Sequence, residues 1–441
     1  MKPPKFLYGL VLLCAVLGAP HAQGETPECG VGQGSALTEL GCELAKALKL
    51  TRSEGLVVVA PPESRPVLAR EKALVTQVAR VVGGALRLQA FHESASLAKA
   101  RRLASKSERL VFLRLAIRDG QIRLSADVYP TRQRFWERLR NPSPSPHQHA
   151  FASRPVDAEI RGYYPAVPLV ASKIQRFPSP ERDVVALACA DLDADQATEL
   201  AIVARRRIHI GRFRSGRFQA WSSVAWAQLS PVAPFPLRQP IAGVWARTGF
   251  LDVGLSDRAQ MVRFDAALQV IAKAPRRIPW PPGGCSRFAG IGLRGEIERC
   301  TDGDAPPPIH ALGQPLDAIA GLRLVTRKGE RRTIYAGRTA NTNTVSLGDD
   351  AGRQVALEGA GAQLALGDLD GDGQPELLAT KDTLSSSEDA LVAYTWQDSG
   401  QLMRRFEVRA PGIAAMGVCP WEGHGLAPVV VATREELWVL Q

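Results

Sequence analysis

The first part of the chain alternates between two spacings of apolar residues, one typical of helices and one typical of strands. Leu37, Leu40, Leu44 and Leu48 recur at helical spacing. The run LVVVA at 56–60 is short and continuous, as in a buried strand. The same reasoning predicts helices at 36–50, 68–82 and 94–105, with Gly83-Gly84 ending the second, and strands at 56–60, 86–91, 110–117, 122–129 and 135–139. This order of elements predicts a small α/β domain over residues 25–160.

The remainder, residues 161–441, has short apolar runs separated by turn residues and no convincing helical spacing. Six runs recur about every 40 to 50 residues, and each is predicted to be the second strand of a four-stranded blade. They lie at 200–204, 251–255, 296–300, 333–337, 377–381 and 429–432. Third strands are predicted at 208–213, 260–264, 344–347, 391–396 and 437–440. The predicted fold class is therefore multidomain: an α/β domain followed by an all-β, six-bladed β-propeller.

The last predicted blade lacks an outer strand, because the sequence ends at Gln441 directly after its third strand. The segment KIQRF at 173–177 is similar to MRRFE at 403–407, the predicted outer strand of the fifth blade. We therefore expect residues 172–178 to complete the final blade and to close the ring. Closure removes exposed strand edges, which otherwise pair with other chains and promote aggregation.

Two acidic loops interrupt the predicted strands. The candidate ligands are Asp368, Asp370, Asp372 and Glu376 in one loop and Asp191, Asp193, Asp195 and Glu199 in the other. Carboxylate oxygens at alternate positions of a tight loop are the ligands that Ca²⁺ prefers. Gly373 supplies a positive φ in one loop, whereas Gln196 replaces that glycine in the other. The alternative interpretation of each loop is an acidic turn that holds no ion.

These motifs resemble the FG-GAP (VCBS-type) repeat, whose D-x-D-x-D-G-x-x-[DE] loop joins two strands of a propeller blade. The resemblance implies one or two Ca²⁺ ions, bound at 368–376 and at 191–199. The order of elements before residue 160 is similar to the amino-terminal domain of TolB-type periplasmic proteins. That likeness depends on element order alone, and it also implies a six-bladed propeller after the α/β domain.

Residues 1–24 are typical of a secretory signal peptide. Lys2 and Lys5 precede an apolar run at 6–19, and small residues follow at 22–24. The run is too short to span a bilayer, and no later run is long enough. The sequence therefore predicts a periplasmic or secreted protein without a transmembrane anchor.

Six cysteines remain after the predicted signal peptide, and an even number in an exported chain favours disulfides. Cys29–Cys42 and Cys285–Cys300 would close short loops. Cys189 and Cys419 both end a predicted first strand of a blade. If the first and last blades adjoin, these two cysteines are expected to be neighbours and to form a disulfide that locks the ring.

The sequence favours a binding or scaffolding role in the cell envelope, with calcium stiffening the propeller loops. It contains no G-x-S-x-G, no H-E-x-x-H and no phosphate-binding Gly-Lys loop. The formal net charge of +11 favours an envelope protein or a polyanion as partner, and export argues against nucleic acid. One alternative is an enzyme whose active site lies at the channel mouth, built from distant blades. Another is a diverged relative whose acidic loops are purely structural.

Overall fold

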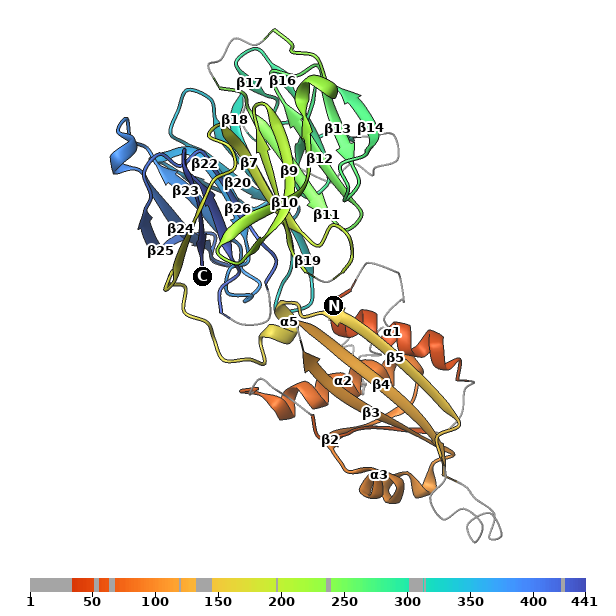
Figure 1. Cartoon of the computed structure of the whole chain (residues 1–441). Helices are drawn as coiled ribbons and strands as arrows, with labels where there is room; N and C mark the ends of the chain where they lie inside the picture. The colour runs from red at the N-terminus through yellow and green to blue at the C-terminus, as the bar shows by residue number, and fades with distance from the viewer. Residues whose placement is uncertain are drawn as a thin grey trace, which may run out of the picture.

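The computed structural model consists of an α/β domain and a β-propeller, joined by a short linker (Figure 1). It describes residues 34–50, 55–62, 68–118, 120–131, 145–195, 197–234, 239–300, 312, 315–421 and 425–441. The predicted signal peptide, Cys29, Gln196 and the predicted strand at 135–139 lie outside the described residues. Among the described helices, none is long and apolar enough to cross a membrane.

The amino-terminal domain is a five-stranded sheet with helices on both faces. Its strands, in spatial order β2-β1-β3-β4-β5, are β1 (Gly55–Val59), β2 (Gln89–Ser94), β3 (Arg109–Arg118), β4 (Gln121–Pro130) and β5 (Gln148–Pro155). Its helical segments are α1 (Ala36–Leu48), α2 (Glu71–Leu86), α3 (Leu97–Leu103), η1 (Ala104–Lys106) and α5 (Ala158–Arg161). The apolar faces of α1 and α2 share one core with the sheet, and α3 packs on the opposite face. This is the layered arrangement that the sequence predicts.

The second helix is longer than predicted. It continues through Gly83 and Gly84 to Leu86, and Arg87 ends it in a left-handed conformation with φ of 57°. Gly83 serves close packing and not termination, because a Cβ there would lie 3.1 Å from the Cβ of Ala90. The longer helix moves the start of β2 from the predicted residue 86 to residue 89.

Strand β5 was not predicted from the sequence. Its buried positions are Ala150 and Ala152, and small alanines give a weak apolar signal. It pairs with β4 from Gln121 to Val128 and forms one edge of the sheet. His149 on this strand is exposed and shares a 2.7 Å hydrogen bond with Asp127, so it is a surface residue.

The propeller consists of five sheets whose first strands surround a central channel. Two four-stranded blades come first in the chain: β7 (Val184–Ala190), β8 (Glu199–Ala204), β9 (Arg207–Arg214) and β10 (Arg217–Ala225), then β11 (Ala242–Arg247), β12 (Phe250–Leu255), β13 (Gln260–Phe264) and β14 (Val270–Pro275). Two more end it: β22 (Ala360–Gly367), β23 (Glu376–Lys381), β24 (Ala390–Trp396) and β25 (Leu402–Arg409), then β26 (Ala415–Val418), β27 (Val429–Ala432), β28 (Glu436–Leu440) and β6 (Ile174–Pro178). Short 3-10 turns lie at η2 (Trp226–Gln228) and η3 (Ser386–Glu388).

The fifth sheet has seven strands and lies between the second blade and the blade that begins at β22. Its strands are β15 (Arg277–Trp280), β16 (Gly284–Ala289), β17 (Gly292–Leu293), β18 (Leu316–Val325), β19 (Arg331–Thr339), β20 (Val345–Asp349) and β21 (Gln354–Leu357). A single pair, Leu293 with Leu316, joins its two parts.

The prediction of six separate blades is wrong. Within the described residues only four sheets are separate four-stranded blades, and the remaining span forms the seven-stranded sheet. The predicted second strand at 296–300 does not form; the described contact there is an isolated bridge between Cys285 and Glu298. This stretch is rich in glycine and proline and carries too few strand-forming residues for a blade of its own. The other five predicted second strands correspond to β8, β12, β19, β23 and β27.

The ring is closed as the sequence predicts. Strand β6 pairs antiparallel with β28, from Ile174 opposite Leu440 to Pro178 opposite Glu436. Cys189 and Cys419, at the adjacent strands β7 and β26, have Cα atoms 4.7 Å apart and form a disulfide. Two separate connections therefore hold the first blade to the last.

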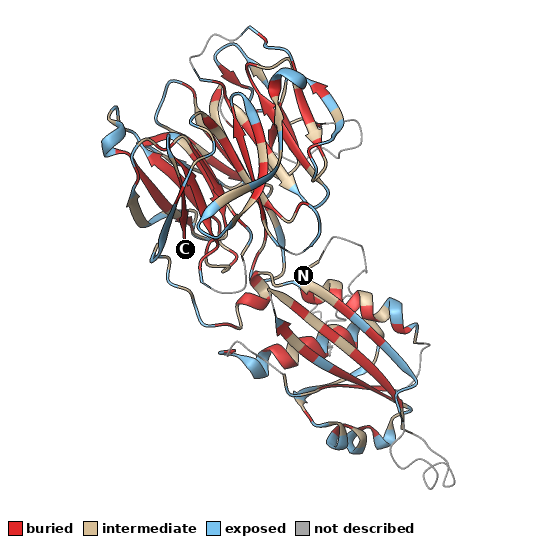
Figure 2. Ribbon diagram, viewed as in Figure 1, coloured by how far each residue is buried: buried red, intermediate tan, exposed pale blue. Residues whose placement is uncertain are grey.

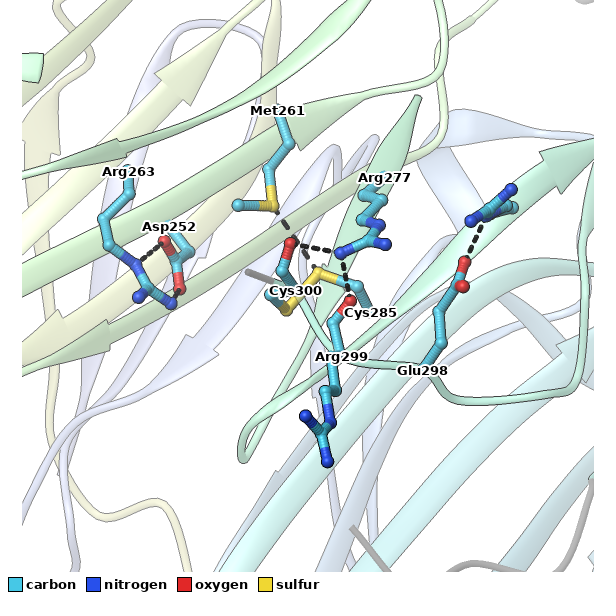
Figure 3. Close-up of a disulfide and its surroundings, with 9 residues drawn as sticks. Asp252, Met261, Arg263, Arg277, Cys285, Glu298, Arg299 and Cys300 are labelled. Atoms are coloured by element: carbon cyan, nitrogen blue, oxygen red, sulfur yellow. Dashed lines mark hydrogen bonds and ion pairs between the residues drawn. A yellow bond between two sulfur atoms is a disulfide. The ribbon is translucent and has the colours of Figure 1, made fainter. Parts of the chain in front are cut away.

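The second predicted disulfide of the propeller, Cys285–Cys300, fastens the irregular part of the seven-stranded sheet (Figure 3). Arg277 donates a 2.6 Å hydrogen bond to the carbonyl of Cys300 and another to that of Arg299. The sulfur of Met261 lies 3.5 Å from that of Cys285. The disulfide and Arg277 thus replace the strand pairing that this stretch lacks.

Burial follows the strand order within each blade (Figure 2). The second strands β8 and β23 are buried along nearly their whole length, whereas the outer strands β6 and β25 are largely exposed. Trp226, Trp280 and Trp396 are fully buried between the sheets, as expected for packing residues. Trp221 is the exception, with 51% of its surface exposed on β10.

Candidate metal centre

The two acidic loops lie at equivalent places, each between the first and second strands of a blade. In each loop three carboxylates bring ligand oxygens within 4.8 Å of one another. These groups are Asp191, Asp193 and Glu199 in the first loop (191–199) and Asp368, Asp370 and Glu376 in the second loop (368–376). The predicted ligands Asp195 and Asp372 are not part of either group. They accept hydrogen bonds of 2.9 and 2.7 Å from backbone N–H groups of their own turns.

The closing glutamate has the same structural role in both loops. It begins the second strand of the blade, and its Oε2 accepts a hydrogen bond from the backbone of the loop's second residue. This bond measures 2.6 Å from Leu192 to Glu199 and 2.8 Å from Leu369 to Glu376. Both glutamates are almost completely buried, at 1% and 0% exposure. A buried carboxylate needs a compensating positive charge, and the two loops differ in how they supply it.

In the first loop, Arg212 supplies the positive charge. This residue of β9 lies opposite Glu199, because its neighbour Gly211 pairs with Leu200. Its guanidinium donates hydrogen bonds of 2.8 and 2.6 Å to the two oxygens of Asp195, and others to Glu199. The arginine, together with backbone hydrogen bonding, lowers the pKa of Asp195 to about 2. The guanidinium thus neutralises the carboxylates that the sequence suggested as calcium ligands.

In the second loop, a threonine stands at the position of Arg212. Thr395 on β24 pairs with Glu376, and its hydroxyl donates a 2.9 Å hydrogen bond to Oε1 of that glutamate. Among the described residues, no arginine or lysine makes a hydrogen bond or ion pair to the carboxylates of Asp368, Asp370 or Glu376. The second loop therefore has the same acidic group as the first loop without its internal cation.

The electrostatics of the second loop reflect this missing charge. Burial, followed by the neighbouring Asp372 and Asp370, raises the pKa of Asp368 to about 7. Burial and Asp372 raise the pKa of Asp370 to about 6, and burial raises that of Glu376 well above its usual value. Oδ1 of Asp368 is shielded from solvent and has no hydrogen-bond partner among the described residues. A hard divalent cation bound to these oxygens would balance the negative charge of the carboxylates and give Oδ1 of Asp368 a partner.

Two glycines allow the second loop to pack against the rest of the molecule. Gly371 and Gly373 have φ of 67° and 80°, values that side chains rarely adopt. A Cβ on Gly373 would lie 2.8 Å from the backbone nitrogen of Arg327, in the turn between β18 and β19. In the first loop the position of Gly371 is taken by Ala194, which has φ of 64°. The second loop is therefore built for close contact with its surroundings.

Two arginines hold the second loop from outside. Arg327 donates hydrogen bonds of 2.8 and 3.1 Å to the carbonyl and side chain of Asp372. Arg161 of α5 donates a 3.4 Å hydrogen bond to the carbonyl of Asp370. Both contact the loop's periphery, so they leave the cluster of Asp368, Asp370 and Glu376 open to a cation.

The central channel is narrow and apolar. Its cavity of about 170 Å³ is lined by residues of β7, β11, β18, β22 and β26 and by Pro279 and Pro281, and no ionisable side chain is among them. The strands approach closely through glycines: a Cβ on Gly321 would lie 1.6 Å from the carbonyl oxygen of Pro281. Among the described residues, the grouped carboxylates lie in the blade loops and not in this channel.

Sequence reasoning located both acidic loops but missed the residues that distinguish them. Arg212 and Thr395 come from the third strand of each blade, 13 and 19 residues after the closing glutamate. The available signal was Arg212 near the end of the strand RIHIGRF, where the equivalent strand ALVAYTW has Thr395. Arg161 and Arg327 belong to other elements altogether, and no local pattern marks them.

No protein-family model matches the chain, and no curated protein matches it. Solved structures match it at low identity. A DUF4221-family protein from Bacteroides vulgatus is 9% identical, covering 62% of this chain and 97% of its own, with a TM-score of 0.35. TolB from Acinetobacter baumannii is 10% identical, covering 89% and 94%, with a TM-score of 0.28. Virginiamycin B lyase from Staphylococcus aureus is 10% identical, covering 61% and 99%, with a TM-score of 0.33. These values are too low to bear on function, and the FG-GAP resemblance stays a prediction.

Proposed function

We propose that this protein is an exported binding or scaffolding protein of the cell envelope, without catalytic activity, in which one calcium ion stiffens the propeller. The observation that carries this proposal is the contrast between the two acidic loops. They share a backbone arrangement and a buried closing glutamate, but Arg212 neutralises one and Thr395 leaves the other uncompensated. The second loop is then an FG-GAP-type calcium site, and the first is a variant that needs no ion.

The residues of the second loop fit calcium. Asp368, Asp370 and Glu376 would hold the ion through oxygen atoms only, as a hard cation requires. The solvent-shielded Oδ1 of Asp368 would gain its missing partner. The ion would tie the start of β23 to the end of β22 and so stiffen one blade.

The apolar channel supports binding over catalysis. An active site at the channel mouth would require ionisable groups from several blades to converge there. The cavity at the channel centre is lined by apolar side chains, glycines and prolines, whereas the ionisable side chains beside it, Arg161, Arg323 and Asp368, line a separate cavity toward the amino-terminal domain. Scaffolding requires a rigid ring, and the closing strand β6 and the Cys189–Cys419 disulfide supply one.

The disulfides support export, and the net charge bears on the partner. The disulfides Cys189–Cys419 and Cys285–Cys300 are typical of oxidising compartments such as the periplasm or the extracellular space. The net charge of +11 favours an anionic partner, either an envelope protein or a polyanion.

Calcium is expected to stabilise the protein by a small, saturable amount. Extracellular calcium modules bind with dissociation constants of about 10⁻⁴ to 10⁻³ M. At about 1 mM free calcium, one such site adds roughly 0.4 to 1.4 kcal/mol to the free energy of unfolding by mass action. The measurement is the melting temperature in chelator and in rising calcium. Asp370→Ala is expected to remove most of the calcium-dependent rise.

Asp193→Ala is the matched control, since Asp193 occupies the position of Asp370 in the first loop. Because Arg212 already neutralises that loop, this variant should keep the full calcium-dependent rise. Identical melting of the wild type in chelator and in saturating calcium would mean that both loops are ion-free turns. An equal loss of the rise in both variants would refute the assignment to one loop.

A further inference from the structure

A second cavity lies beside α5. Figure 1 shows α5 where the amino-terminal domain meets the propeller. The volume of the cavity is about 430 Å³, which is in the usual range of ligand pockets. One wall is the segment from Val156 to Arg161, and the others come from β18, β22, the second acidic loop and the segment 418–421. Most lining side chains are apolar. Domain interfaces are a frequent place for such sites.

Arg161 is the unusual residue of this interface cavity. It is only 7% exposed, and its guanidinium stacks against Trp421 and Tyr164, with distances of 4.3 and 5.0 Å to the ring centroids. Its Nε donates a hydrogen bond to the carbonyl of Asp370. Its two terminal nitrogens have no hydrogen-bond or ion-pair partner in the part of the chain that the structure describes.

The Arg161 side chain is buried in the wall of the cavity, and its two terminal nitrogens are free to donate to an anion that enters the cavity. The aromatic rings hold its plane in place, so the donors are pre-organised for a planar, bidentate acceptor such as a carboxylate. Asp157, an acidic residue nearby, accepts backbone hydrogen bonds from Ala36 and Ile160. Asp368 belongs to the second acidic loop.

We infer that the interface cavity is a binding site for a carboxylate carried on an apolar body, with Arg161 as the residue that pairs with the carboxylate. The apolar walls accept the body of the ligand, and Arg323 adds a second positive charge at the exposed rim. Both a peptide with an apolar carboxy-terminal residue and a small free carboxylic acid present this chemistry.

Calcium increases the affinity of the interface cavity for the carboxylate. This step rests on the function proposed above. Asp368 lines the cavity and Asp370 contacts Arg161 through its carbonyl, so their negative charges oppose an incoming carboxylate. A calcium ion in the second acidic loop neutralises them and leaves Arg161 as the dominant charge. By thermodynamic reciprocity the carboxylate then tightens calcium binding by the same factor.

The test uses three probes and calorimetric titration of the full chain, in calcium and in chelator. N-acetyl-phenylalanine presents the carboxylate and the apolar body, N-acetyl-phenylalaninamide lacks the charge, and inorganic phosphate lacks the body. We expect the acid to bind about tenfold or more tightly than the amide, since a charge-assisted hydrogen bond is lost. Phosphate is expected to bind more weakly than the acid. A hexapeptide with a free carboxy-terminal phenylalanine separates the sources: tighter binding than the acid indicates a peptide, and equal binding a small acid.

Arg161→Met keeps the stacking length of the side chain and removes its charge, and it should abolish the preference for the acid. Arg176→Met is the matched control, because Arg176 also packs on a tryptophan, 4.1 Å from the ring centroid of Trp438, but neither lines the cavity nor contacts the second acidic loop. It should leave binding of the acid unchanged. Near-ultraviolet circular dichroism checks that both variants are folded. Equal binding of acid and amide, or unchanged binding in a folded Arg161→Met protein, would overturn the site.

The two proposals fail in different ways. If binding of the acid depends on Arg161 but is equal in calcium and chelator, the anion site stands and its coupling to calcium is refuted. If calcium stabilises the protein but the acid does not bind, the calcium site stands and the anion site is refuted.

Discussion

Replacing both Cys189 and Cys419 with serine is expected to lower the free energy of unfolding by about 5 kcal/mol. The disulfide joins β7 of the first blade to β26 of the last, and the two cysteines are 230 residues apart in sequence. In the chain-entropy account, a cross-link restricts the unfolded chain more as the closed loop lengthens. This disulfide encloses most of the propeller, so its removal is expected to have the largest effect of any substitution considered.

Urea unfolding of the oxidised proteins, followed by tryptophan fluorescence, measures this effect. The matched control is the double variant Cys285→Ser with Cys300→Ser, which opens a loop of only 15 residues and should cost about 3 kcal/mol. If the Cys189/Cys419 variant loses no more stability than this control, the ring is held by the pairing of β6 with β28 alone.

Replacing Arg212 with methionine is expected to cost about 3 kcal/mol, because it leaves buried carboxylates without their cation. Glu199 is 1% exposed, and the Arg212 side chain is itself only 13% exposed, so solvent screens the pair little. Methionine retains most of the side-chain volume, which separates loss of charge from loss of packing. The first loop of this variant then resembles the second loop, so calcium is expected to recover part of the lost stability.

Thr395→Val is the comparison in the second loop. It removes the hydrogen bond to Glu376 and the acceptor of a 2.9 Å hydrogen bond from Arg405, and should cost about 1 to 2 kcal/mol. Urea unfolding in chelator measures both variants, and repetition in calcium measures the recovery. A cost below about 1 kcal/mol for Arg212→Met would contradict the view that the guanidinium replaces an ion in the first loop.

Ring closure was predictable from the sequence because it depends on the similarity of two short segments and on the number of strands in each blade. The segment 173–177 carries the pattern of an outer strand, and the last blade had no other candidate. The Cys189–Cys419 disulfide followed from that closure, since equivalent positions of adjacent blades lie side by side. Most second and third strands were likewise placed correctly, because buried strands give strong continuous apolar runs.

The seven-stranded sheet was not predictable in this way. The stretch around Cys285 to Cys300 is held by a disulfide, by Arg277 and by one-residue bridges, and none of these leaves a periodic apolar pattern. Counting recurrent runs therefore gave six blades, where hydrogen bonding gives four separate blades and one composite sheet.

The difference between the two acidic loops was also not predictable from the sequence. Eight carboxylates were named from spacing alone, and the structure brings together three in each loop. What separates the loops is the side chain opposite the closing glutamate, Arg212 or Thr395, which reaches the loop across a neighbouring strand. Spacing along the chain cannot report such a contact, because it is set by strand register.

Calorimetric titration of the wild-type protein with calcium tests the central claim most directly. The account predicts one ion per chain with a dissociation constant of about 10⁻⁴ to 10⁻³ M. Binding should be lost in Asp370→Ala, and a second ion should bind in Arg212→Met. Two equivalent ions in the wild type, no measurable binding, or unchanged binding in Asp370→Ala would contradict the account.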